Sequence, residues 1–299
     1  MAGCNCNAGL GNTGRPGCVP IQSVTSKLIM VPLNANDGTL NGIDLSAPLP
    51  TWNSLVNEPD ASKRWFPLPA FENVELPKAE SQFEEANSGR MAFLREGKRS
   101  FSGELWGEDS TPTLLGKMKA GRCVNFGVYV VDVTGNLIGS KVNGYLYPIP
   151  VDNQSWNPTF MFATDSTVQK IMLTFDFDRL FDDSTMYMIT ATEANLDFNT
   201  LTGLIDVNLV ETSSSATQVV LEATFDYGTA LNPILLQGVT STSDWEIFDV
   251  TNQLSLGSPT AVSELPAGTY TLLKSLTVGD TYTVSVVKDG FTGSVTFTV

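Results

Sequence analysis

The chain has 299 residues, which fits one large or two ordinary domains, and 42% of them are hydrophobic, enough to build a core. Its formal net charge is −15, which argues against a surface that grips nucleic acid, because phosphate contacts need clustered cations. It contains no histidine, so Ser-His-Asp and Cys-His catalysis, histidine-ligated metals and histidine pH switches are excluded. No apolar run approaches the ~18 residues of a membrane span, and the N-terminus lacks the regions of a signal peptide. We therefore expect synthesis in the cytoplasm and no membrane partner.

Residues 1–33 are expected to form an N-terminal arm followed by a first strand over 24–31. The arm contains Cys4, Cys6 and Cys18 in a Gly/Asn-rich stretch. Their spacing does not match the paired knuckles of structural zinc sites, so we favour reduced cysteines on a flexible arm over a metal site completed by Cys123. Disulfides after release into an oxidising medium are a further alternative. Cys123 itself is expected to be a buried small hydrophobe, and no cofactor is expected.

Residues 34–70 are expected to be a long loop, because prolines interrupt every apolar run. A loop of this length is usually functional or ordered against a partner. Its large apolar side chains make disorder unfavourable, and four of them are candidates for contacts between subunits: Trp52, Leu55, Trp65 and Phe66.

Residues 71–200 are predicted to form a β-rich domain. Alternating residues and turn signals predict an antiparallel meander over 71–85, 91–95 and 101–106. One short helix is predicted from Pro112, capped by Ser110 or Thr111 and ended by Gly121. Further strands are predicted over 123–133, 137–146, 168–177 and 186–192.

Residues 201–299 shift to a Val, Thr, Ser and Leu composition with about seven short strands, which suits an immunoglobulin-like sandwich. This domain has no cysteine pair, so its core must rest on packing, expected around Trp245, Phe248, Tyr270, Tyr282 and Phe297. The predicted fold class is mainly β: an antiparallel β-sandwich or barrel-type domain with one short helix, plus a C-terminal immunoglobulin-like β-sandwich.

No group of residues in the sequence forms a recognisable catalytic constellation. The carboxylates of Asp176, Asp178, Asp182 and Asp183 are favoured as a solvated strand face and turn over a glycosidase pair or a calcium loop. The glycine-rich residues 9–14 lack the strand and helix of a phosphate-binding loop. An enzyme is therefore not expected.

Two charged groups invite an assembly role instead. An acidic stretch would become a strongly negative surface if a ring of subunits repeated it: Glu72, Glu75, Glu80, Glu84 and Glu85. The cations that follow are interleaved with carboxylates, so we expect solvation or pairing with acidic faces of neighbouring subunits rather than DNA binding: Arg90, Arg95, Lys98 and Arg99.

Three segments together carry a family resemblance. They are the meander ENVELPKAESQFEEANSGRMAFLREGKRSFSGELWGED, the helix TPTLLGKMKAG and the strand pair CVNFGVYVVDVTGNLIG, within about residues 70–190. With the arm, the long loop and an added immunoglobulin-like domain at 204–299, this pattern resembles the tail tube proteins of long-tailed bacteriophages. It is a likeness of segment order and not of a diagnostic motif.

The resemblance implies a virion subunit, made in the host bacterial cytoplasm, that assembles with itself into stacked rings, expected to be hexameric. DNA would pass through the tube without specific binding, along an acidic wall to which the five glutamates would contribute, or these residues would make ring contacts. The arm and loop would bridge rings. Other tail or neck proteins would be partners, and the outer C-terminal domain would offer weak contact to glycans.

Two other functions remain open from the sequence. Another virion component, such as a neck or capsid decoration protein, shares the same composition. A surface adhesin or carbohydrate-binding module would use Trp52, Trp65 or Trp156 as stacking platforms, although such tryptophans are more often core or interface residues.

Overall fold

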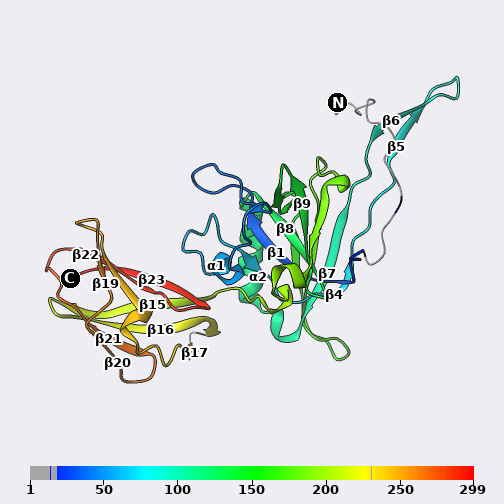
Figure 1. The fold of residues 1–299 in the computed structure, drawn as a ribbon. Coiled ribbons are helices and arrows are strands. Elements are labelled where there is room, and N and C mark those ends of the chain that lie inside the picture. The colour runs from blue at the N-terminus through cyan, green and yellow to red at the C-terminus, as the bar shows by residue number, and fades with distance from the viewer. Residues whose placement is uncertain (1–13, 15–18, 230) are drawn as a thin grey trace.

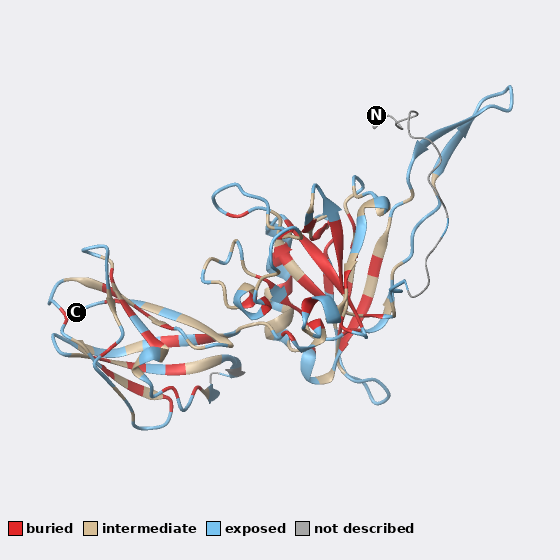
Figure 2. Cartoon of the chain, viewed as in Figure 1, coloured by how far each residue is buried: buried red, intermediate tan, exposed pale blue. Residues whose placement is uncertain are grey.

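The computed structural model describes residues 14, 19–229 and 231–299 and is mainly β. A first β-rich domain ends near residue 200, and a C-terminal domain begins at residue 205 (Figure 1). Buried residues gather in the centre of each domain, and a long exposed hairpin extends from the first domain (Figure 2).

In the first domain, the described residues form two sheets and one separate hairpin. The larger sheet consists of β1 (Thr25–Pro32), β2 (Ile43–Asp44), β3 (Phe66–Pro67), β8 (Phe126–Asp132), β9 (Leu137–Val142), β10 (Tyr145–Tyr147), β11 (Ile149–Pro150) and β14 (Met186–Ile189). The smaller sheet has the order β12 (Asn157–Met161), β13 (Lys170–Asp176), β7 (Ser100–Trp106) and β4 (Glu72–Glu75). The hairpin pairs β5 (Gln82–Glu85) with β6 (Met91–Arg95).

Short helices fill the connections of both domains. They are α1 (Trp52–Val56), α2 (Pro112–Ala120), α3 (Ala191–Ala194), and the 3-10 helices η1 (Gly107–Asp109), η2 (Gly121–Cys123), η3 (Asp183–Thr185), η4 (Phe198–Thr200) and η5 (Thr242–Asp244). Helix α2 confirms the predicted signals. Pro112 is its first residue, the Thr111 hydroxyl accepts a hydrogen bond from the Leu114 N–H at 3.2 Å, and Gly121 follows its last residue.

Every residue of β8 is buried, because both faces of the larger sheet are covered. One face packs on the smaller sheet, where Val128 and Val130 join a cluster with Phe101, Phe175 and Trp156. The opposite face belongs to a second cluster built largely from the 34–70 segment and the chain near α3. A strand covered on both sides carries a continuous apolar run, as 126–131 does.

The 34–70 segment therefore differs from the predicted structureless loop, since it holds β2, α1 and β3. It docks on its own domain and covers the apolar face of the larger sheet. Trp52 is 5% exposed and donates its indole N–H to the Ala194 carbonyl at 2.9 Å, and Trp65 is 4% exposed beside Tyr129. The assignment of Trp52 and Trp65 to contacts between subunits is wrong, because both side chains are buried within the domain.

The described residues of the C-terminal domain form nine strands. They are β15 (Ile205–Ser215), β16 (Gln218–Thr229), β17 (Asn232–Leu235), β18 (Trp245–Asp249), β19 (Leu254–Gly257), β20 (Ala261–Glu264), β21 (Thr269–Leu273), β22 (Thr281–Val286) and β23 (Phe291–Thr298). One layer has the order β20-β21-β16-β15 and the other β19-β18-β22-β23, and β15 joins them by pairing in parallel with β23. This is the strand arrangement of an immunoglobulin-like sandwich, as predicted.

The core of this domain follows the expected aromatic residues with one exception. Trp245, Tyr270, Tyr282 and Phe297 are buried in one cluster. Phe248 is only half-buried and lies outside that cluster, because burial alternates along β18 and the inward positions are Trp245, Ile247 and Asp249. The expectation for Phe248 was therefore wrong, because its neighbour Ile247 takes the inward position.

Candidate functional site

The chain between β4 and β7 leaves the smaller sheet and forms the long hairpin that ends in β5 and β6 (Figure 1). β4 pairs directly with β7, so the expected meander does not run through the sheet: its middle two strands pair only with each other. Every residue of β5 and β6 is exposed (Figure 2). An isolated two-stranded hairpin is marginally stable in water, so this one needs further contacts to hold its shape.

The exposed hairpin surface is unusually apolar. Phe83 and Phe93 are register partners whose rings meet edge to face at 5.7 Å, and they remain 53% and 48% exposed. Met91 is 62% exposed and Leu94 is 55% exposed on the same short hairpin. By register and alternation Phe83, Phe93 and Met91 share one face of the hairpin, and exposed apolar side chains gathered in this way are typical of a protein interaction site.

Ion pairs anchor the base of the hairpin to the domain. The Asp183 carboxylate accepts from Lys78 Nζ at 2.7 Å and from Arg99 Nη2 at 3.0 Å. The hydrogen bond from Arg99 holds the pKa of Asp183 below its usual value. A β-carbon on Gly97 would overlap the Ala79 carbonyl, so the two strands of the stem approach too closely for a larger residue.

The predicted cations divide into two groups. Lys98 Nζ lies 2.5 Å from the Asp176 carboxylate, and Arg99 is held by Asp183. The assignment of Lys98 and Arg99 to contacts between subunits is therefore corrected, because their charges are engaged within the chain. Arg90 and Arg95 are exposed on the hairpin, where Arg95 Nε donates to the Gln82 side chain at 2.8 Å.

The five predicted glutamates do not form one surface. Glu80, Glu84 and Glu85 belong to the hairpin and its stem, whereas Glu72 and Glu75 lie on β4. All five are exposed. Of the two remaining loop candidates, Phe66 is 39% exposed and Leu55 is half-buried against the core, so their role in assembly stays a prediction.

Glu72 and Glu75 lie at the edge of the outward face of the smaller sheet. Register pairs Glu72 with Glu104 and Glu75 with Ser102. The Glu104 carboxylate accepts from Lys170 Nζ at 2.7 Å, which holds the pKa of Glu104 below its usual value. A hollow of about 210 Å³ on this sheet is lined mainly by small polar residues: Pro77, Ser100, Phe101, Ser102, Ser155, Thr174, Phe175 and Asp176.

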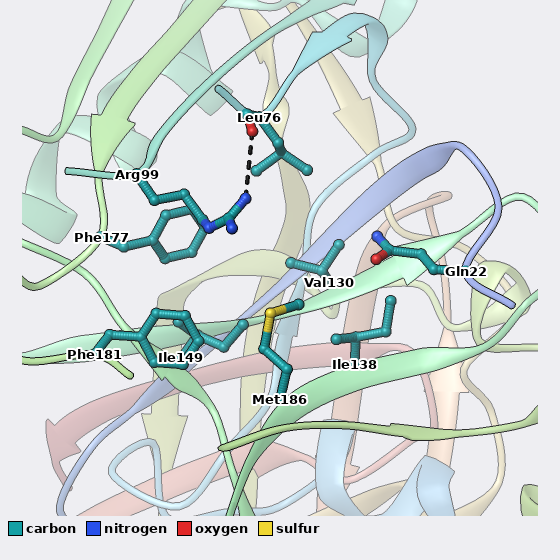
Figure 3. A pocket seen from close by; sticks show the side chains of 9 residues that line it. All are labelled: Gln22, Leu76, Arg99, Val130, Ile138, Ile149, Phe177, Phe181 and Met186. Carbon is teal, nitrogen blue, oxygen red and sulfur yellow. Dashed lines mark hydrogen bonds between the residues drawn. The ribbon is translucent and has the colours of Figure 1, made fainter. Parts of the chain in front are cut away.

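A second cavity of about 120 Å³ lies between the sheets near the base of the hairpin (Figure 3). Its walls are mostly apolar, including Ile138, Phe177 and Met186, and Arg99 lies at one side with Nη1 donating to the Leu76 carbonyl at 3.4 Å. No nucleophile and base are brought together there, so this cavity offers no arrangement for catalysis.

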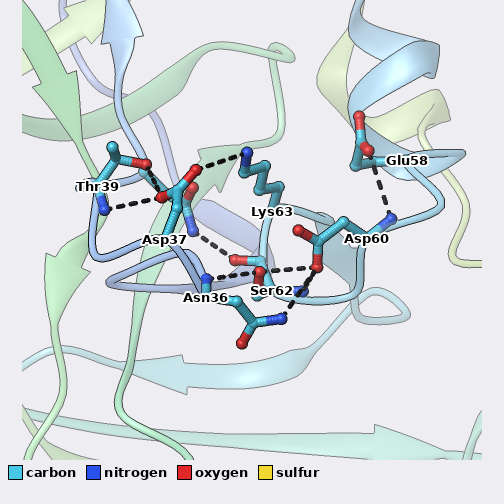
Figure 4. Close-up of polar contacts among 8 residues, drawn as sticks. Asn36, Asp37, Thr39, Glu58, Asp60, Ser62 and Lys63 are labelled. Atoms are coloured by element: carbon cyan, nitrogen blue, oxygen red, sulfur yellow. Dashed lines mark hydrogen bonds and ion pairs between the residues drawn. The ribbon is translucent and has the colours of Figure 1, made fainter.

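A polar cluster connects two loops of the 34–70 segment (Figure 4). Asp37 pairs with Lys63 at 3.0 Å, and hydrogen bonds from the Thr39 side chain and backbone hold the pKa of Asp37 well below its usual value. Asp60 accepts from Ser62 in the same way. Each carboxylate accepts a hydrogen bond from the backbone N–H two residues later and so stabilises its own turn, which is a structural role. Within residues 14, 19–229 and 231–299, no three His, Cys, Asp or Glu side chains are grouped to hold a metal.

Several other sequence expectations have definite outcomes. Cys123 is exposed on η2, so the expectation of a buried thiol is wrong: the strand begins only at Phe126. Cys4, Cys6 and Cys18 lie outside the described residues. Trp156 is fully buried and donates its indole N–H to the Met118 carbonyl at 2.7 Å, so it cannot serve as a stacking platform.

Comparisons with known proteins leave the function open. No protein-family model and no curated protein matches the chain. Among solved structures, the full ectodomain of mouse nectin-like molecule 4, with domains Ig1 to Ig3, is 10% identical over 93% of this chain and 94% of that chain, with a TM-score of 0.18. A likeness at that score carries no argument about fold or function. In the part of the chain that the structure describes, no helix combines the length and apolar character needed to cross a membrane.

Proposed function

We propose that the chain is a non-catalytic structural subunit that assembles with copies of itself into stacked rings, as in a phage tail tube that conducts DNA. The observation that carries this proposal is the exposed hairpin, whose four large apolar side chains are left uncovered by the residues that the structure describes. Monomeric proteins rarely expose large apolar side chains in a group, whereas a subunit of an assembly buries them against its neighbour.

Charge supports a second copy of the chain as the partner. Residues 78–99 carry five cations and four carboxylates, a net charge of +1, on a chain whose net charge is −15. The hairpin is thus far less acidic than the rest of the chain. It would meet the acidic body of another copy with favourable electrostatics, and Arg90 and Arg95 are exposed for that contact.

The outward face of the smaller sheet supports passage of DNA without binding. Glu72 and Glu75 are exposed there, and Ser100, Ser102 and Thr174 are small polar residues of the same face. The two glutamates repel phosphate, and the charge of Lys170 on this face is already paired with Glu104 at 2.7 Å. In a ring, this face would line the channel.

Negative-stain electron microscopy with mass determination of the purified full chain tests the proposal. We expect rings with a central channel, or tubes, for the native chain, and dispersed monomers for the F83S/F93S variant. The control L254S/V278S removes two exposed apolar side chains of the C-terminal domain and should assemble like the native chain. A native chain that stays monomeric over a wide concentration range would overturn the proposal, and so would assembly of F83S/F93S equal to that of the control.

The same images separate the alternatives. Closed oligomers without stacking would favour a neck or capsid decoration protein, and deletion of residues 1–20 tests whether the arm bridges rings. The carbohydrate-binding alternative loses its named platforms, because Trp52, Trp65 and Trp156 are all buried.

A further inference from the structure

The two domains have separate hydrophobic cores. Among the described residues, both clusters of the first domain end by Leu204, and the cluster of the C-terminal domain begins at Val207. Leu201 is buried in the first domain, and Leu204 packs against the same cluster. Lys27 fixes the start of this connection, because its amino group donates to the carbonyls of Asn199 and Leu201. The connection is therefore anchored to the first domain up to Leu204.

One lysine of the first domain contacts the C-terminal domain at three points. Lys117 Nζ, on α2, lies 2.6 Å from the Asp206 carboxylate and 3.1 Å from that of Asp226, and 5.0 Å from the centre of the Tyr227 ring. Asp206 is on β15 and Asp226 on β16, so the lysine joins neighbouring strands at the end of the domain nearest the connection. Among the described residues one further hydrogen bond joins the domains, from the Gly290 N–H to Asn57 Oδ1 at 3.4 Å.

We infer that Lys117 is an electrostatic latch that holds the C-terminal domain against α2 and releases it when the contact is broken. Without a shared apolar core, domain motion is the default, and the polar contacts decide the position. The three partners are each a third to a half exposed, so salt screens the contact. The domain is therefore held at low ionic strength and swings about residues 204–205 at high ionic strength. This inference does not depend on the proposed function.

Isotope-mixed cross-linking of the full chain tests the contact. Equal amounts of ¹⁴N and ¹⁵N chain are treated with a carbodiimide, which joins an amine to a carboxylate only when they touch, and the linked peptides are identified by mass. We expect Lys117 linked to Asp206 or Asp226 of the same chain, with a yield that falls as salt rises. Links found only between light and heavy chains, or none at either salt concentration, would overturn the latch.

Proteolysis of the connection tests the release. K117Q removes the latch, and the control K119Q removes the neighbouring exposed lysine of α2, which has no ion pair among the described residues. We expect cleavage within residues 202–206 to be faster in K117Q by about tenfold, the equivalent of losing 1.4 kcal/mol. K119Q should match the native chain, and high salt should bring the native chain to the K117Q rate. Equal rates in all three chains at low salt would contradict the inference, and an unchanged thermal melt shows that both variants fold.

Discussion

The Tyr282 hydroxyl accepts a hydrogen bond from the Thr277 N–H at 2.8 Å, five residues upstream. Tyr282 is 1% exposed and is the second residue of β22, where its ring joins the core of the C-terminal sandwich. A tyrosine at this place in an immunoglobulin-like domain ties the preceding corner to the core. In a domain without a disulfide, this bond ties the loop before β22 to its strand, and the bond from the Trp245 indole to the Val239 carbonyl, at 2.9 Å, does the same for β18.

Tyr282→Phe leaves the buried ring in place and deprives the Thr277 N–H of its acceptor. We expect the C-terminal domain to lose about 1 kcal/mol of unfolding free energy, or about 4–8 °C in its melting temperature. Scanning calorimetry of the full chain measures this. Tyr187→Phe, at a 40% exposed site of the first domain, should leave the transition unchanged. Equal melting temperatures of both variants would mean that the hydrogen bond between Thr277 and Tyr282 does not stabilise the domain.

Gly97→Ala is expected to open the stem of the hairpin, because the added methyl group would overlap the Ala79 carbonyl oxygen. The Ala79 N–H, which donates to the Lys98 carbonyl at 2.8 Å, should then exchange its hydrogen faster. Hydrogen exchange read by mass spectrometry checks this. Gly116→Ala is the matched control, since nothing lies within 4 Å of the added carbon. Unchanged protection in Gly97→Ala would mean that the stem accommodates a side chain.

Acid should loosen the hairpin base through Asp183. Its folded pKa lies below its usual value, chiefly through the hydrogen bond from Arg99, so its ionised form stabilises the fold. That contribution is complete above the unfolded pKa, about 3.9, and is lost as pH falls through the folded pKa. Asp183→Asn should therefore be less stable near pH 7 and lose less on acidification than the native chain. Unfolding followed from pH 7 to pH 2 tests this, with exposed Asp165→Asn as the control.

Trp52→Ala is expected to destabilise the single chain, because Trp52 covers the larger sheet and is not an assembly contact. Truncation of a buried tryptophan costs about 3–5 kcal/mol. Phe66→Ala, at a 39% exposed site, should have little effect on unfolding. Denaturant unfolding of both variants separates the two roles. A stable Trp52→Ala chain with defective assembly would restore the subunit-contact hypothesis.

Reversing the charges on β4 should make assembled particles retain DNA. Glu72→Lys with Glu75→Lys places two cations per subunit on the proposed channel face, and binding should weaken steeply as salt rises. A filter-binding assay at several salt concentrations measures this. Glu211→Lys with Glu222→Lys makes the same change of charge on the C-terminal domain and should retain less DNA. Equal retention by the two variants would place the β4 glutamates outside the channel.

The sequence predicted local structure well because the signals were local. The cap at Thr111 and Pro112 fixed α2, and alternation with turn residues fixed most strands of both domains. The hairpin escaped prediction because alternating residues and a turn look the same in a sheet and in a free hairpin. Whether β4 pairs with β5 or with β7 depends on contacts more than twenty residues apart.

Burial of the tryptophans was also beyond the sequence. A large apolar residue between prolines fits a contact between subunits and an internal cover equally well. The difference lies in the second face of β8, which is apolar and needs a cover from the same chain. The prediction that Cys123 is buried was wrong for a simpler reason. Cys123 is the last residue of η2, and the buried strand begins three residues later, at Phe126.

The parallel pairing of β15 with β23 has a practical outcome for anyone who extends this polypeptide. Ile205 lies beside Phe291 at the end of the sandwich nearest the first domain, and β23 runs outward from there for eight residues, about 26 Å. Val299 therefore lies at the far end of the C-terminal domain (Figure 1). A fluorescent protein or affinity tag fused after Val299 would lie at a distance from the hairpin and the acidic sheet face and would leave both surfaces accessible.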